Sequence, residues 1–283
     1  MPPAAAPTMT TPSAIRLRLS KLARPPTRST ASTPIPSSII ATNVTARWTF
    51  IAPLAYRRSP AVSSKAPARY CRAVDPEQAR IVRRRSVSST QDIARDLPIG
   101  SVVVADHQSA GRGRLEHRWE APAGTALLAS FVLKPNRLLS LAAGVAAAEA
   151  CGPAVRLKWP NDLLLGGRKV GGILIEASPA KAVCGIGINL TWAPVGAAQL
   201  DQPRKQVLNR LRPAIERWCS APPEEVLARW RQLSDSLGRR VRVELPGRSF
   251  EGIAEDIDSH GQLIVDGTVV SAGSLIHLTA PGD

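Results

Sequence analysis

Two glycines alternate with two arginines in the stretch from His107 to Trp119, directly after an apolar run. Glycine lets backbone N–H groups come close to an anion, and guanidinium groups offer paired donors that match phosphate or carboxylate oxygens. Gln108 precedes this Gly-Arg-Gly-Arg motif, and Arg118 follows it. We therefore predict a phosphate-binding loop. From these residues alone, the alternative is a glycine turn that carries solvated surface arginines.

A second candidate cluster runs from Lys158 to Asp162 and reads Lys-Trp-Pro-Asn-Asp. Asn161 and Asp162 offer oxygen atoms, which suit Mg²⁺ or another counter-ion of a triphosphate. Taken residue by residue, the alternative is a tight Trp-Pro turn with Asn and Asp as turn residues and a surface lysine.

The segment from Arg168 to Gly172 reads Arg-Lys-Val-Gly-Gly and follows a glycine turn. Lys169, just past that turn, would place a positive charge on a rigid element, as the stabilisation of a specific oxyanion requires. Gly171 and Gly172 would let a ligand approach the backbone without obstruction by a Cβ atom.

The patterns around these motifs predict a sheet with packed helices. β-Branched or alternating apolar runs predict strands at 81–87, 101–106, 125–133, 155–159, 163–165, 170–176 and 182–190. The last run alternates glycine with isoleucine, which close strand packing alone would explain. Helical spacing predicts a short helix that ends near residue 97, and longer ones at 137–151, 203–217 and 223–237. Only one convincing crossover helix lies between the strands, so we predict an α+β fold with a mixed, mainly antiparallel sheet and helices on one side.

Short alternating strands separated by glycine turns follow Gly238, at 241–245, 249–257, 262–265, 268–270 and 275–278. Such a run predicts a small SH3-like barrel. We therefore expect three regions, namely a tail at 1–74, a catalytic domain at 75–237 and an SH3-like domain at 238–283.

The formal net charge of +15 belongs mostly to the tail. Residues 1–74 contain eleven Arg or Lys and no Asp or Glu, which leaves 26 basic and 22 acidic residues in the rest of the chain. The tail is rich in Pro, Ala, Ser and Thr, and we expect it to be disordered. A transit peptide, a mis-assigned start and a basic nucleic-acid arm remain alternatives, although the periodicity of a helix-turn-helix is missing.

The four cysteines, Cys71, Cys151, Cys184 and Cys219, are scattered and form no Cys-x-x-Cys pair. They predict reduced thiols rather than a zinc site or a disulfide framework. Uninterrupted apolar runs stay short of the roughly 18–20 residues of a membrane span, so we expect a soluble, cytoplasmic protein, or an organellar one if the tail is a transit peptide.

Taken together and in this order, the motifs resemble those of the biotin-protein ligases, also called biotin–acetyl-CoA-carboxylase ligases. The resemblance runs from about Ile81 to Leu278. It rests on Ser89-Thr90, on the Gln108 to Arg114 motif with Trp119, on Lys158 to Leu163, on Lys169 to Glu176 and on Gly185 to Asn189.

The resemblance implies a two-step reaction that uses ATP, biotin and Mg²⁺. The biotin carboxylate attacks the α-phosphate of ATP to give biotinyl-5′-adenylate and pyrophosphate. A lysine of a biotin carboxyl carrier protein domain then attacks the mixed anhydride. An anion that approaches an anionic phosphate needs cations and fixed N–H donors, in agreement with the residue types of the motifs.

The resemblance also implies residue roles. Lys169 would grip the carboxylate and the α-phosphate, while Arg112 and Arg114 fold over the adenylate as part of a mobile lid. Ser89, Thr90 and Gln108 would bind the biotin head group, and Asn161, Asp162 and Asn189 the nucleotide and magnesium. The other expected binding residues are Gln91, Gly111, Gly113, Trp119, Lys158, Gly171, Gly172 and Gly185.

This sequence departs from the family pattern at two places. Gln91 stands where the family usually has Asn, and Glu116-His117 stands where it usually has Gly-Arg. Glu116 places a carboxylate near the loop and would be strained if its φ were positive. We therefore expect a leakier lid, which a comparison of adenylate dissociation with a Glu116→Gly variant would test.

Two other functions remain as alternatives. A lipoate or octanoate ligase would resemble the same catalytic fold, but the Gly-Arg-Gly-Arg motif and the small C-terminal barrel argue against it. A biotin-responsive DNA-binding regulator would need a winged helix, for which the sequence offers no pattern. The expected partner is the carrier domain, with neither DNA nor membrane, and a homodimer is left open.

Overall fold

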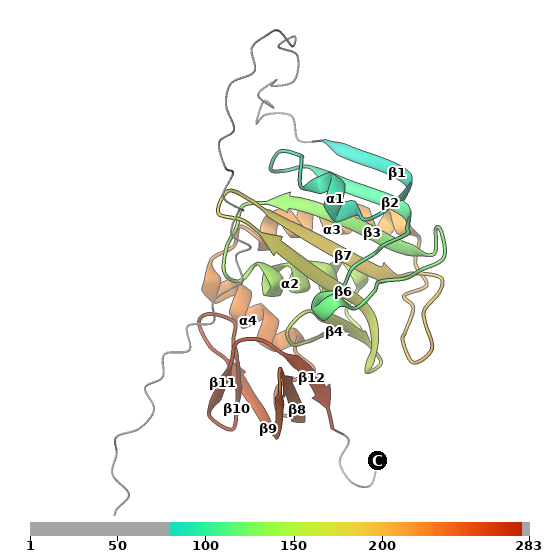
Figure 1. Ribbon diagram of the computed structural model, residues 1–283. Helices are drawn as coiled ribbons and strands as arrows, with labels where there is room; N and C mark the ends of the chain where they lie inside the picture. The colour runs from blue at the N-terminus through green and yellow to red at the C-terminus, as the bar shows by residue number, and fades with distance from the viewer. Residues whose placement is uncertain (1–79, 279–283) are drawn as a thin grey trace, which may run out of the picture. The chain divides into compact units, whose positions relative to one another are not determined.

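The computed structural model describes residues 80–278, and its larger sheet has seven strands in the order β1-β2-β3-β7-β6-β5-β4 (Figure 1). β1 and β2 are parallel, and all other neighbours are antiparallel, which confirms the mixed, mainly antiparallel sheet. The strands are β1 (Ile81–Val87), β2 (Val102–Gln108), β3 (Ala126–Leu133), β4 (Val155–Lys158), β5 (Asp162–Leu165), β6 (Arg168–Ala177) and β7 (Ala182–Asn189).

The helices lie on both faces of this sheet, so the prediction of helices on one side is wrong. Successive side chains of β2 point to opposite faces of the sheet and belong to two hydrophobic clusters. Val102 and Val104 join the main core, while Val103 packs with Ala94 of α1 on the other face. Figure 1 shows α1 in front of the strands and α3 behind them. The helices are α1 (Thr90–Ala94), α2 (Leu139–Cys151), α3 (Arg204–Trp218) and α4 (Pro223–Leu233).

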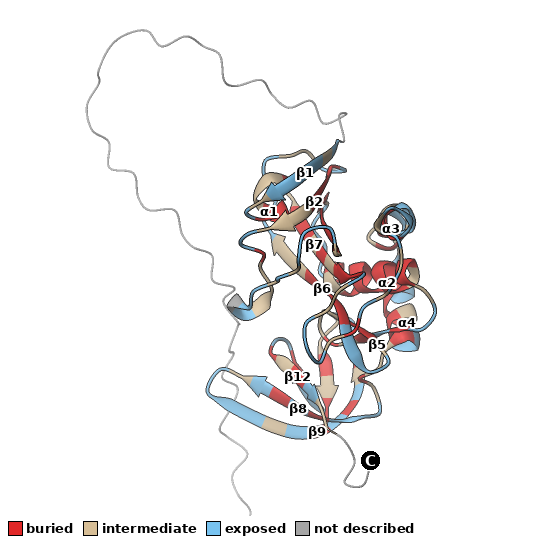
Figure 2. Cartoon of the chain, turned by 90° about the vertical axis from the view of Figure 1, so that its right-hand side faces the viewer, coloured by how far each residue is buried: buried red, intermediate tan, exposed pale blue. Residues whose placement is uncertain are grey.

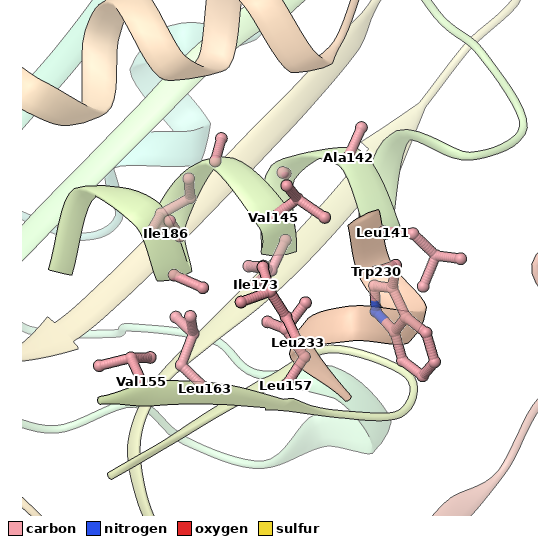
Figure 3. Packing of buried hydrophobic residues seen from close by; sticks show 14 of the residues in the cluster. Leu141, Ala142, Val145, Val155, Leu157, Leu163, Ile173, Ile186, Trp230 and Leu233 are labelled. Atoms are coloured by element: carbon pink, nitrogen blue, oxygen red, sulfur yellow. The ribbon is translucent and has the colours of Figure 1, made fainter. Parts of the chain in front are cut away.

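Helix α2 is buried almost all round, as Figure 2 shows by its colour. It packs on the sheet with one side and against α3 and α4 with the other, which explains its many alanines. In Figure 3, Val145 lies close to Ile173, and Trp230 of α4 lies beside Leu141. This core supports the sheet from the face opposite α1.

Two helix ends differ from the expected ones. Helix α2 begins at Leu139 rather than at 137, because the Asn136 side chain accepts a hydrogen bond from Leu138 N (3.0 Å) before the helix begins. Helix α4 ends at Leu233 rather than at 237. The N–H groups of Ser236 and Leu237 donate to Ser234 Oγ, and these side-chain bonds take the place of further helical ones.

The C-terminal region forms a separate sheet in the order β11-β10-β9-β8-β12, and all its neighbouring strands are antiparallel. This agrees with the expected SH3-like module. The boundary near Gly238 stays a prediction. The strands are β8 (Arg240–Leu245), β9 (Arg248–Ile257), β10 (Leu263–Val265), β11 (Thr268–Val270) and β12 (Ser274–His277).

Within residues 80–278, none of the helices is long and apolar enough to cross a membrane. The expected disordered tail at 1–74 and Cys71 lie outside the described residues. The other three cysteines are free thiols, and burial raises the pKa of Cys151 to about 12.

Candidate active site

A cavity of about 260 Å³ lies on the α1 face of the large sheet. Helix α1, the loop after β2, the segment before β5 and strands β6, β7 and β12 line it. The predicted site residues among its lining are Ser89, Thr90, Gln91, Gln108, Arg112, Gly113, Arg114, Trp119, Lys158, Asn161, Asp162, Lys169, Gly172 and Gly185. The structure therefore brings together motifs that lie far apart in the sequence.

One part of the cavity carries a directed set of hydrogen bonds. Gln108 Oε1 accepts bonds from Thr90 N (2.8 Å) and Thr90 Oγ1 (2.9 Å). Because the one hydroxyl proton of Thr90 is used there, Ser130 Oγ must donate to Thr90 Oγ1 across 2.8 Å. Ser89 caps α1, since its Oγ accepts a bond from Gln91 N at 3.3 Å. These polar groups are thus fixed before any ligand arrives.

The Gly-Arg-Gly-Arg loop is closed by its own backbone. Trp119 N donates to the carbonyl of Gly111 (3.0 Å), and Gly113 N donates to that of His117 (2.6 Å). A Cβ atom at Gly111 would lie 2.3 Å from the Trp119 carbonyl oxygen, so only glycine fits there. Positive φ falls on Leu115 (52°), within a short 3-10 turn. The strain expected if φ of Glu116 were positive stays a prediction.

The glycines of β6 and β7 make room for Trp119. A Cβ atom at Gly187 would lie 2.5 Å from the indole ring, and one at Gly172 would lie 3.5 Å from it. Gly171 does not line the cavity, and a Cβ atom there would meet the Gly187 carbonyl oxygen at 2.8 Å. The glycine–isoleucine alternation of β7 thus serves close packing as well as the cavity.

Arg112 is held by carboxylates of α1 and β6. Its guanidinium lies 2.7 Å from Asp92 and 3.6 Å from Glu176, and Arg95 bridges the same two acids at 3.1 and 2.6 Å. The hydrogen bond from Arg112 holds the pKa of Asp92 below its usual value, against the opposing effect of burial. Arg112 therefore fastens the loop to the sheet.

Arg114 reaches from the loop to two other parts of the molecule. It donates to Asn161 Oδ1 (3.0 Å) and to the carbonyl of Gly273 (3.3 Å), next to β12. Burial lowers the pKa of this guanidinium, and the charge of Asp162 acts in the opposite direction. The Asn161 side chain also donates to the Ile173 carbonyl (2.8 Å), which ties it to β6.

Asp162 lies between two lysines. Lys169 Nζ is 2.6 Å from Asp162 Oδ1, and Lys158 Nζ is 3.9 Å from Oδ2. No cluster of three or more His, Cys, Asp or Glu suited to a metal occurs among residues 80–278. A single carboxylate fits Mg²⁺ only as a partner of substrate phosphates, which commonly complete the coordination of this ion.

Asn189 lies outside the cavity lining, at the end of β7. Its side chain donates to the Ala198 carbonyl (3.0 Å), and Ala198 N donates to the Lys169 carbonyl (2.8 Å). In this structure Asn189 therefore fastens the segment after β7 beside Lys169.

Two family models match the chain, the biotin/lipoate A/B protein ligase family over residues 83–191 and the biotin protein ligase C-terminal domain over residues 236–274. The biotin–[acetyl-CoA-carboxylase] ligase of Mycobacterium tuberculosis is 38% identical over 212 residues, which cover 63% of this chain and 79% of that protein. The chain belongs to the biotin protein ligase family. The bifunctional ligase/repressor BirA of Escherichia coli is 30% identical over 202 residues, covering 60% of this chain and 63% of that protein.

Solved structures of the family share the fold. The biotin protein ligase of Aquifex aeolicus in complex with biotin and ATP is 26% identical, with a TM-score of 0.61 over 70% of this chain and 99% of that one. The Helicobacter pylori biotin acetyl coenzyme A carboxylase synthetase with bound biotinylated ATP is 25% identical, with a TM-score of 0.56 over 68% of this chain and 99% of that one.

Both family regions contribute to the cavity, including residues that the motifs did not indicate. Ser130 supports Thr90 from β3, and Ser274 and Leu275 line the cavity from β12. A signal for Ser130 exists, since it is the single polar residue in the run 126–133. The residues of β12 carry no such signal, because nothing local relates them to the loop.

Proposed function

We propose that this member of the family is a biotin protein ligase, which joins biotin to ATP as biotinyl-5′-adenylate and transfers the biotin to a lysine of a carrier domain. The observation that carries the proposal is that one cavity joins two kinds of site. Thr90 and Gln108, with Ser130 supporting Thr90 from behind, suit a polar head group, and Lys169 and Arg114 suit a carboxylate and a phosphate.

The register of the sheet indicates how far apart these two kinds of site lie. Gln91 of the head-group region abuts Gly185, and Lys169 abuts Gly172, which pairs with Gly187. Two residues along a strand span roughly 6.5 Å. The distance between the two kinds of site therefore suits a substrate with a polar ring and a carboxylate at the end of a short alkyl chain.

In the first step, a carboxylate oxygen forms a bond to the α-phosphorus as the bond to pyrophosphate breaks. Lys169 and Arg114 offset the negative charge that gathers there, and they are already positioned by Asp162 and Asn161. When bound, Mg²⁺ would neutralise pyrophosphate charge, and Asp162 is the residue that would hold it. In the second step, the carrier lysine attacks the carbonyl carbon, and AMP leaves.

The central experiment is ATP-dependent labelling of a biotin carboxyl carrier domain with biotin, run beside lipoate. We expect the wild type to label the carrier with biotin. In Lys169→Ala and Arg114→Ala, we expect the rate of labelling to fall on the order of 100-fold or more. Lys205→Ala, on the exposed side of α3, is the matched control and should keep full activity. Labelling with lipoate alone would overturn the proposal in favour of a lipoate ligase.

A single-function ligase, rather than a ligase that also regulates transcription, is the second part of the proposal. We expect a chain without residues 1–74 to label the carrier at the rate of the full chain, with no sequence-specific DNA binding by either. Sequence-specific binding by the full chain would instead support a regulator. A cytoplasmic location is proposed as well, and a fluorescent fusion of residues 1–74 that enters an organelle would contradict it.

A further inference from the structure

Ser236 carries a hydroxyl group that is fully buried between α4 and β8, outside the cavity lining. Its backbone is fixed on both sides, since its N–H donates to Ser234 Oγ (3.1 Å) and its carbonyl accepts a bond from Arg239 N (3.2 Å). A buried hydroxyl destabilises a fold unless it is hydrogen-bonded. The partners of this hydroxyl therefore indicate what Ser236 does.

The Ser236 hydroxyl lies between a backbone N–H and an imidazole. Its Oγ accepts a hydrogen bond from Trp159 N (3.1 Å), and it lies 3.0 Å from His277 Nε2 on β12. A hydroxyl oxygen can accept one bond and still share a second with a ring nitrogen. These two contacts therefore hold the hydroxyl in place beside the Trp159 backbone.

The Trp159 N–H depends on this acceptor because it belongs to a turn. The ladder between β4 and β5 does not include residues 159–161, and Trp159 is 2% exposed, so its N–H needs a partner inside the protein. Two more bonds hold the same turn, from Trp159 Nε1 to the Gly261 carbonyl (3.1 Å) and from Ser140 Oγ to the Pro160 carbonyl (3.3 Å). Contacts from other elements therefore set the position of the turn.

This turn leads into the two residues that orient the cations of the cavity. Asn161 Oδ1 accepts a bond from Arg114 (3.0 Å), and Asp162 Oδ1 lies 2.6 Å from Lys169 Nζ. The head-group residues on α1 and β2 bond to each other instead. A displacement of the turn would therefore move the cations and leave the head-group residues in place.

We infer that Ser236 is a positioning residue for the first step of the reaction, which acts through the Trp159 backbone on Arg114 and Lys169. The inference rests on the proposed function. Without the hydroxyl, the buried Trp159 N–H loses its acceptor, and the turn shifts to find another. The two cations then lose their alignment with the reacting phosphate, where a misplacement of about 1 Å can lower a rate on the order of 100-fold.

The decisive variant is Ser236→Ala, which removes the acceptor. Pyrophosphate release at saturating biotin measures adenylate formation, and we expect its kcat/KM for ATP to fall about tenfold. Isothermal titration measures the dissociation constant for biotin alone, which should stay within about twofold of the wild-type value.

Ser101→Ala is the matched control. Ser101 is also fully buried, its Oγ accepts a bond from Arg80 N (3.3 Å), and it lies outside the cavity lining. This change should lower Tm as Ser236→Ala does, and it should leave both kcat/KM for ATP and biotin affinity unaltered.

Ser236→Cys serves if the alanine variant does not fold, because a thiol is a weak acceptor, and we expect its kcat/KM for ATP to be intermediate. Equal losses in kcat/KM for ATP and in biotin affinity would show a merely structural role and overturn the inference. If the wild type forms no adenylate from biotin and ATP, the proposed function fails. If the wild type forms it and the Ser236 variants use ATP as well as Ser101→Ala does, only the role of Ser236 fails.

Discussion

The lack of a side chain at Gly187 determines the shape of the cavity there. A methyl group there would lie 2.5 Å from the Trp119 ring, whose Nε1 atom is itself buried without a partner. The indole closes over β7 only because this position has no side chain. Sequence reasoning found the glycine alternation of β7, but its partner is a tryptophan more than sixty residues earlier.

Gly187→Ala should displace the indole and cost roughly 1–3 kcal/mol of biotin binding and of stability, as overpacking does. Biotin affinity and Tm are the measurements. Gly144→Ala in α2 is a suitable control, because its Cβ atom would meet Leu157 at an ordinary 3.5 Å. That change should stabilise the helix by about 0.5–1 kcal/mol. Unaltered biotin affinity in Gly187→Ala would show that the indole does not need its present position.

At the scale of elements, ion pairs attach the loop to α1 and β6. Arg112 binds Asp92 and Glu176, and Arg95 binds the same two acids from the other side. This arrangement separates the two arginines of the motif, since Arg112 holds the loop in place while Arg114 reaches towards Asn161. The sequence had suggested one shared role for both.

Asp92→Asn should loosen the loop and speed dissociation of the adenylate a few-fold. The pair is about one-third exposed, so its contribution is about 1 kcal/mol or less and falls with added salt. The dissociation rate at low and high ionic strength measures this effect. Glu251→Gln, an acid that pairs with Arg242 on the C-terminal sheet, is the control. If the adenylate dissociates at equal rates from the wild type and from Asp92→Asn at low salt, this ion pair does not help to retain the adenylate.

At the scale of the whole described part, the C-terminal sheet is bonded to the segment that bears Trp159. Trp159 Nε1 donates to the Gly261 carbonyl (3.1 Å), and Trp159 N donates to Ser236 Oγ (3.1 Å). Ser236 Oγ also lies within hydrogen-bond distance of His277 Nε2 (3.0 Å), and His277 Nδ1 lies 3.7 Å from Asp235. Burial of His277 at this connection disfavours its protonated form.

Stability should therefore fall as the pH is lowered from about 6.5 to about 4. Burial, and then the charge of Lys158, lower the pKa of His277 to about 4, while Asp235 opposes them. The unfolded chain binds a proton in this range and the folded one does not, so stability is fully present above pH 6.5 and is lost towards pH 4. Tm measured against pH should have a flatter profile in His277→Gln. His260→Gln, at an exposed site, should keep the wild-type profile, and an equally steep profile in His277→Gln would contradict the prediction.

The sequence by itself determined the local features of this protein. Strands such as β1 and β3, the helices and the glycine–arginine loop follow from alternation, spacing and residue type, which act over a few neighbouring residues. The chemical character of the cavity could be predicted for the same reason, because it follows from the residue types of the motifs. Only the tertiary structure decided that α1 covers the opposite face from α2, that Ser130 supports Thr90, that Gln91 has no partner and that β12 lines the cavity. These features depend on packing between segments distant in the chain, and no local pattern specifies such contacts.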